Sequence, residues 1–117
     1  SGAYIGAYDV SNLSDIENTD LIQSWSGLGN VIPHNTHVAG NYLVTSYYTD
    51  GVTIVDASDP YNLIEVAYFD TSPQYEGEGF YGCWGTYPFL PSGLILATDR
   101  QNGLHILSTP YSEFFND

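Results

Sequence analysis

This sequence has almost no basic residues. Fourteen Asp and Glu stand against one Lys or Arg, Arg100, so the net charge at pH 7 is −13. Proteins bind nucleic acid and anionic surfaces largely through Lys and Arg, whose charges replace counterions around phosphate groups. The composition therefore argues against nucleic acid and anionic membrane as partners.

Sulfur, helical patterns and long apolar runs are also scarce. The 117 residues include one cysteine, Cys83, and no methionine. A single cysteine excludes an internal disulfide, and its ordinary role is that of a small buried hydrophobic residue. No run approaches the ~18 apolar residues that span a bilayer, and no window has the spacing of an amphipathic helix. The chain starts SGAY, without an initiator Met or a signal peptide, and we expect a processed or truncated piece of a longer protein.

Short runs of β-branched and aromatic residues, bounded by Gly, Pro, Asn and Asp, make up most of the chain. Their alternation predicts an all-β domain of antiparallel strands joined by short turns. With 43% apolar residues, such a domain can bury a core. The expected strands cover residues 3–10, 20–26, 35–39, 42–48, 52–57, 63–70, 81–87, 94–99 and 103–108.

Two dipeptides, Asp50-Gly51 and Asn102-Gly103, give the strongest turn signals. Each lies between apolar runs, and such pairs tolerate positive φ at both centres of a tight hairpin. Gly40-Asn41 and the Pro91-Ser92-Gly93 segment predict one further turn before each hairpin.

These hairpins repeat along the chain. The segment Asp9-Val10-Ser11-Asn12 lies 47 positions before Asp56-Ala57-Ser58-Asp59, and Gly51 lies 52 positions before Gly103. A period of this size, with four short antiparallel strands in each unit, predicts the blades of a β-propeller.

The repeat divides the sequence into four units. They are the last two strands of one blade (1–27), a complete blade (28–70), three strands of a further blade (71–109) and a tail (110–117). About two and a half blades do not close a ring, because propellers have about four blades or more. We therefore expect unpaired edges at the first and last strands unless another sheet pairs with them.

The runs PHNTHVAGNYLVTSYYTDGVTIVDASDPYNLIEVAYFDT and GFYGCWGTYPFLPSGLILATDRQNGLHIL resemble the choice-of-anchor B family, whose propellers are built from LVIVD repeats. The resemblance covers roughly residues 3–108, and TIVDASDP at 53–60 matches the repeat core. It implies a secreted or surface-attached propeller of bacteria or an archaeal relative, without established enzymatic activity. The N-terminal blades of that family and a recognisable anchor after residue 108 are missing from this sequence.

His34 and His37 stand at the start of an expected innermost strand. Such strands line the central channel of a propeller, so His34 is a candidate metal ligand there. The alternative is structural, with His34 hydrogen-bonding a neighbouring blade. Residues three apart on a strand point to opposite faces, so the two histidines are not expected to share one ion.

Acidic residues offer the second candidate site. Asp70, Glu76 and Glu78 lie in or beside the loop DTSPQYEGEG, whose glycines permit wrapping around a hard cation, and calcium is the candidate ion. No EF-hand spacing is present. Asp56 and Asp59 flank the repeated corner, where Asx turns are the simpler interpretation.

Catalytic signatures such as GxSxG, HExxH or a phosphate-binding glycine loop are missing from the sequence. We therefore expect a non-catalytic extracellular module for structural support or interaction at the cell surface. Its expected partners are other blades of a longer chain or neighbouring copies, and carbohydrate or cell-surface components through outward aromatic residues. Two alternatives stay open: a subunit of an extracellular filament or oligomer held by strand pairing, and a calcium-stabilised adhesin.

Overall fold

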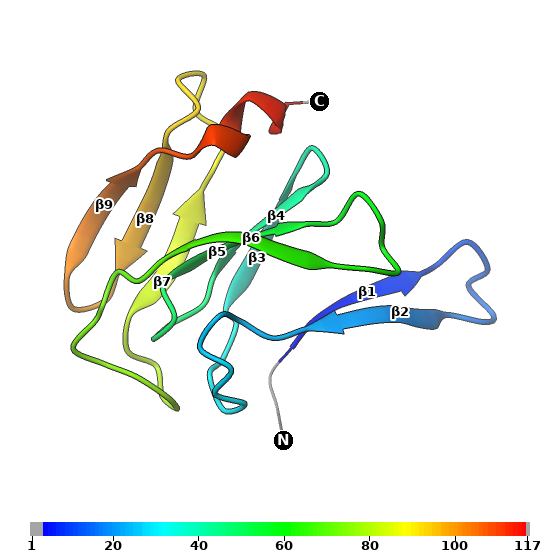
Figure 1. Cartoon of the computed structure of the whole chain (residues 1–117), viewed down its shortest axis with the longest axis horizontal. Helices are drawn as coiled ribbons and strands as arrows, with labels where there is room; N and C mark the ends of the chain where they lie inside the picture. Colours follow the sequence, from blue (N-terminus) through cyan, green and yellow to red (C-terminus); the bar gives the residue numbers. More distant parts are fainter. Residues whose placement is uncertain (1–3, 117) are drawn as a thin grey trace.

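The computed structural model describes residues 4–116 as three antiparallel sheets and one short helix (Figure 1). Sheet A pairs β1 (Ile5–Asp9) with β2 (Glu17–Ile22). Sheet B contains, in chain order, β3 (Asn35–Ala39), β4 (Tyr42–Ser46), β5 (Val52–Asp56) and β6 (Ile64–Phe69). Sheet C contains β7 (Cys83–Tyr87), β8 (Ile95–Asp99) and β9 (Gly103–Leu107), and the 3-10 helix η1 (Pro110–Phe114) follows it.

The prediction of an all-β, antiparallel protein is confirmed. The three sheets lie within the units 1–27, 28–70 and 71–109, although residues 1–3 and 117 lie outside the described residues. Residues 4–116 do not close into a ring (Figure 1), so the assignment of each sheet to a propeller blade stays a prediction.

One expected strand was misplaced. The sequence predicts a strand over 20–26, but β2 runs from Glu17 to Ile22, and residues 23–26 leave the sheet. Trp25 accounts for the difference, because its ring nitrogen donates to the backbone oxygen of Asp50 at 2.9 Å and so ties this segment to sheet B. Apolar alternation marks such residues as strand, whereas the long-range hydrogen bond holds them in a loop.

The two hairpin turns also differ from the prediction. Positive φ occurs at Gly51 and Gly103, but Asp50 and Asn102 keep negative φ. The β8–β9 connection spans residues 100–102, as the expected strands leave it, whereas the β4–β5 connection spans 47–51 and is longer than the expected 49–51. Gly51 has no freedom to carry a side chain, since an added Cβ would lie 2.1 Å from the backbone oxygen of Phe69.

Sheet B lies between the other two sheets (Figure 1). The larger core cluster joins sheets B and C and includes Val44, Val52, Ile54, Ile95 and Ala97, which are at most 4% exposed. A smaller cluster of Ile5, Val31 and Tyr47 joins sheets A and B. Sheet B therefore packs on a neighbouring sheet through each of its two faces, whereas sheets A and C each do so through one face.

The segment predicted as a tail packs onto the domain. Thr109 caps η1 by accepting a hydrogen bond from the backbone nitrogen of Tyr111, and Phe115 is 3% exposed within the larger core cluster. The helix end approaches the β3–β4 turn so closely that a Cβ on Gly40 would lie 2.2 Å from the backbone oxygen of Phe114. No periodicity indicated this helix, because one turn is too short to show a helical period.

Candidate functional site

Three loops form a cleft of about 260 Å³ lined by aromatic and acidic side chains. The segment after β2 contributes Trp25, the β4–β5 connection contributes Asp50, and the loop after β6 contributes Asp70, Tyr75 and Glu76. Asp70 and Glu76, two of the candidate metal ligands of the sequence, both line this cleft, whereas Trp25 and Asp50 were not indicated as site residues.

Trp25 is fixed on three sides. Its indole nitrogen donates to Asp50, and its backbone nitrogen donates to Oε1 of Glu65 at 3.3 Å. Its ring stacks on Tyr68 of β6 with centroids 4.5 Å apart and an angle of 15° between the planes. With 36% of its surface exposed, Trp25 still offers part of its ring to the cleft.

The carboxylate of Asp50 is buried, with only 2% of the residue exposed. Ser26 donates its hydroxyl proton to Oδ2 of Asp50 at 2.7 Å, which compensates part of the lost hydration. Burial raises the pKa of Asp50 above its ordinary value, and the charge of nearby Asp70 adds to the effect.

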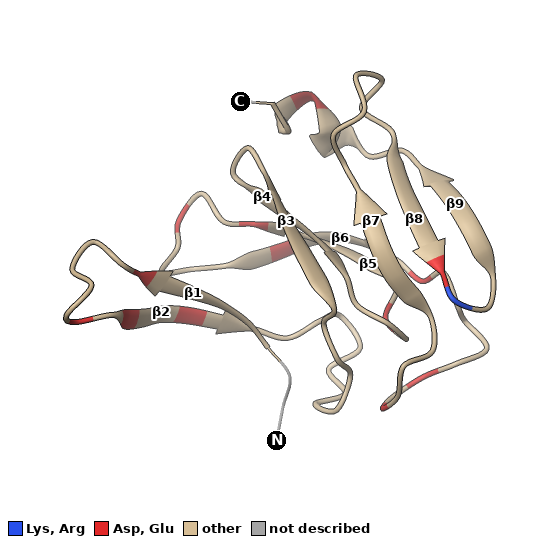
Figure 2. Cartoon of the chain, turned by 180° about the vertical axis from the view of Figure 1, so that it is seen from behind, with Lys and Arg blue, Asp and Glu red and all other residues tan. Residues whose placement is uncertain are grey.

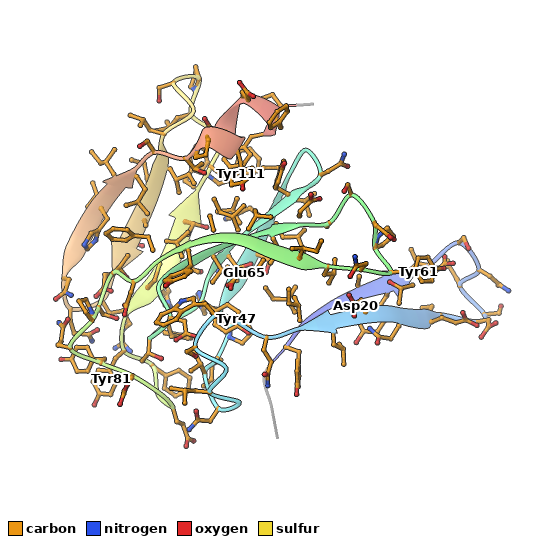
Figure 3. The ribbon with its side chains drawn as sticks, in the orientation of Figure 1. Asp20, Tyr47, Tyr61, Glu65, Tyr81 and Tyr111 are labelled. Carbon is orange, nitrogen blue, oxygen red and sulfur yellow. The ribbon has the colours of Figure 1, made fainter. Side chains whose placement is uncertain are left out.

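Two further titratable groups adjoin these loops: Glu65 of β6 and Tyr47 at the start of the β4–β5 connection (Figure 3). Burial raises the pKa of Glu65 to about 7, and the neighbouring charge of Asp50 adds to it. Burial, followed by the charge of Asp50, raises the pKa of Tyr47 to about 12. Glu65 can therefore take up or release a proton near neutral pH, while Tyr47 stays neutral.

The chemistry of the cleft suits hydrogen-bond donors and cations. The single basic side chain, Arg100, follows β8, where its guanidinium donates to the backbone oxygen of Phe80. Figure 2 shows acidic residues scattered over the molecule and Arg100 at one end of sheet C. Hydroxyl groups of a carbohydrate, or a basic group of a protein, would find acceptors at Asp70 and Glu76.

His34 joins sheet B to sheet C. Its Nδ1 lies 2.6 Å from the backbone oxygen of Trp84, so the Nδ1–H tautomer donates there. The imidazole stacks on Trp84 at 5.3 Å and meets Tyr48 edge-on at 5.2 Å. The structure thus shows the contact expected of the structural alternative, and His34 lines a different cleft from Asp70 and Glu76.

The acidic loop does not assemble with His34. Glu76 and Glu78 are exposed, and Asp70 is half-buried with Oδ1 accepting from the backbone nitrogen of Ser72 at 2.9 Å. Over residues 4–116, no three His, Cys, Asp or Glu side chains lie where they could together hold a metal ion. Calcium binding stays a prediction, and a fall of Tm on adding EDTA is the measurement that would support it.

The corner flanked by Asp56 and Asp59 contains Asx turns at both residues, as the sequence indicated, and the corner at Asp9 contains one as well. Oδ1 of Asp9 accepts from Ser11, and Oδ1 of Asp56 accepts from Ser58, both at 2.9 Å from the backbone nitrogen. Hydrogen bonds from the side chain and the backbone of Ser11 lower the pKa of Asp9, and those from the backbone and the side chain of Ser58 lower the pKa of Asp56. The corner after β5 is also tied to sheet A, because Oδ2 of Asp20 accepts from the backbone nitrogen of Leu63 at 2.7 Å (Figure 3).

Sequence reasoning missed Trp25, Asp20, Asp50 and Glu65 as positioning residues. Each forms its decisive contact with a residue more than twenty positions away. Only Asp50 carried a local signal, as part of a turn dipeptide. The fixed position of the cleft therefore follows from the packing of the sheets.

Among residues 4–116, no helix is long and apolar enough to cross a membrane. Comparisons with protein-family models, with curated proteins and with solved structures found no match for this chain.

Proposed function

We propose that this chain is a non-catalytic, extracellular β-propeller module of the choice-of-anchor B type that provides structural support or interaction at the cell surface. The observation that carries the proposal is the stacking of sheets A, B and C in chain order. Successive antiparallel sheets that pack face to face are the building principle of propellers. The LVIVD-like core at 53–60 forms β5 and its corner in the central sheet.

The acidic cleft supports an interaction role. Trp25 offers a partly exposed ring beside the carboxylates of Asp70 and Glu76. Sugars are bound in this manner, with ring stacking on an aromatic residue and hydroxyl groups donating to carboxylates. The chain's negative charge favours a neutral or basic partner over an anionic one.

Antibodies raised against the chain test the proposed location. In intact cells of the source organism, we expect surface labelling and recovery of the protein with the cell-wall or extracellular fraction. Recovery in the cytosol alone would contradict the proposal.

A binding assay tests the proposed role of the cleft. Fluorescently labelled chain is expected to bind those cells, and the double variant Asp70→Asn, Glu76→Gln is expected to bind at least about tenfold more weakly. The double variant Asp15→Asn, Glu17→Gln is the matched control, because it removes the same charge at the β1–β2 turn and the start of β2, away from the cleft. Equal binding by both variants would exclude the cleft as the binding site.

A second candidate is a subunit of an extracellular oligomer or filament. It is favoured by the exposed apolar faces of sheets A and C, where side chains such as Tyr8 and Ile106 are about three-fifths exposed, at 58% and 62%. Large exposed apolar patches commonly mark sites where proteins associate.

A further inference from the structure

The outer face of sheet C, which turns away from sheet B, is apolar. Leu96 pairs with Tyr87 on one side and with Ile106 on the other, so the three side chains form a row across the sheet. Leu104 lies on the same face opposite Thr98. Leu104 is 59% exposed and Ile106 is 62% exposed.

Three aliphatic residues of this face, on β8 and β9, have counterparts in sheet B that are buried. Adding the repeat period of 52 to Val44, Val52 and Ile54 gives Leu96, Leu104 and Ile106. The three residues of sheet B are 0%, 2% and 4% exposed, because sheet C packs on them through side chains such as Ile95 and Ala97. Sheet C thus repeats the contact residues of sheet B, and within residues 4–116 no further sheet packs on them.

Sheet A also has an exposed face, on the side that turns away from sheet B. A Cβ on Gly6 would lie 2.8 Å from the Tyr8 ring and 3.2 Å from the Leu21 side chain, so these three residues share one face. Tyr8 is 58% exposed and Leu21 is 49% exposed.

The repeat gives these positions buried counterparts as well. With the period of 47, Gly6 and Tyr8 correspond to Thr53 and Val55 of sheet B, which are 1% and 2% exposed. The opposite face of β1 already packs on sheet B through Ile5. The exposed face of sheet A is therefore the face that, in sheet B, lies against the preceding sheet.

We propose that a second copy of this chain covers these faces, with its sheet A packed head to tail on sheet C of the first. The inference rests on the second candidate function and names its partner and surface. The chain already contains two interfaces of this kind, between A and B and between B and C. In the proposed contact, the exposed face of sheet C acts like the face of sheet B that packs on sheet C. The exposed face of sheet A in the second copy acts like the face of sheet B that packs on sheet A.

The symmetry and charge of this contact follow from its geometry. Two different faces meet, so each added copy leaves one new face bare, and the contact generates a ring or a filament. Both copies carry a charge of −13, so their repulsion opposes association and salt screens it. Association therefore strengthens as ionic strength rises.

Sedimentation velocity of the 117-residue chain tests the proposal. We expect the average mass to rise with concentration between about 1 μM and about 1 mM. The single variants Tyr8→Asp and Ile106→Asp each place a charge in the interface and are expected to be monomeric when alone. Val38→Asp is the control, since Val38 is 67% exposed on β3 and lies on neither face, and it should associate like the unchanged chain.

Mixing the two variants provides the decisive measurement. The Tyr8→Asp chain keeps an intact sheet C, and the Ile106→Asp chain keeps an intact sheet A, so a one-to-one mixture should form heterodimers and nothing larger. Circular dichroism and Tm of each variant show whether it is folded. A mixture of folded variants that stays monomeric, an unchanged chain that is monomeric throughout, or a Tyr8→Asp chain that self-associates would overturn the proposal. These outcomes do not change the expected surface labelling of cells, so the labelling experiment tests the proposed location independently.

Discussion

Sheets B and C carry corresponding aliphatic residues in different surroundings. Ile54 of β5 and Ile106 of β9 occupy equivalent positions of the repeat, yet one is 4% exposed and the other 62% exposed. The sequence pattern therefore specifies which face of a sheet is apolar, but a neighbouring sheet decides whether that face is buried. The same aliphatic side chain stabilises the domain in sheet B and is available for association in sheet C.

The largest expected effect comes from the C-terminal segment, which packs into the core between sheets B and C. Phe115→Ala should lower the free energy of unfolding by about 4 kcal/mol, because it removes a ring that is 3% exposed within the B–C core. Urea denaturation measures the loss. Phe114→Ala is the control, since that ring is 42% exposed, and its cost should stay below about 1 kcal/mol. Equal losses of unfolding free energy for the two variants would show that Phe115 is not packed in the core between sheets B and C in solution.

The direct comparison of the two sheets comes next. Ile54→Ala should cost about 3 kcal/mol, because the cavity it leaves lies in the core. Ile106→Ala should cost less than about 1 kcal/mol in dilute solution, where the outer face of sheet C is in water. Denaturation of both variants at micromolar concentration checks the difference. A large cost at Ile106 under these conditions would mean that its face is covered within a single chain.

Glu65 of β6 contrasts a half-buried carboxylate of sheet B with the solvated acidic surface elsewhere. Its folded pKa of about 7 exceeds the ordinary 4.5, so its contribution to stability is fully present below about pH 4.5 and is lost as pH rises through 7. Glu65→Gln imitates the protonated form and should raise stability at pH 8 by about 1 kcal/mol, a value that allows for solvent screening of a half-buried group. No gain is expected at pH 4.

Urea denaturation at the two pH values measures this effect. Glu17→Gln on the exposed start of β2 is the control and should show no such difference between pH 4 and pH 8. A Glu65 variant that is no more stable than the unchanged chain at pH 8 would indicate that the carboxylate is hydrated in solution.

The corner after β5 gives the smallest effect. Asp56→Ala removes the acceptor for the backbone nitrogen of Ser58 and should cost about 0.5 kcal/mol at pH 7. Because that hydrogen bond lowers the pKa of Asp56, its contribution is present above the ordinary value of 3.8 and is lost as pH falls through the lower folded value. In thermal unfolding, the Tm of the variant should lie below that of the unchanged chain at pH 7 but not at pH 2.5. An equal difference at both values would assign the loss to some other contact.

Local patterns in the sequence predicted much of the fold. Strand alternation and turn residues placed nine strands over residues 4–116, one of them displaced, and the Asx turns at Asp56 and Asp59. These features depend on residues close together in the chain, so a single sequence records them. The pairing of Asp70 and Glu76 in one loop was visible for the same reason.

Other features depend on residues that meet only when the sheets pack. Trp25 leaves its expected strand to bond Asp50, His34 reaches Trp84 fifty positions later, and η1 returns to the turn at Gly40. Burial then sets the pKa of Glu65, which in the sequence is one polar residue of an alternating strand. The sequence by itself determined the strands, the positions of their turns and the alternation of their faces, because side-chain alternation and turn residues are local. Only the tertiary structure decided which faces are covered and where carboxylates are buried, because desolvation depends on neighbours that are distant in the chain.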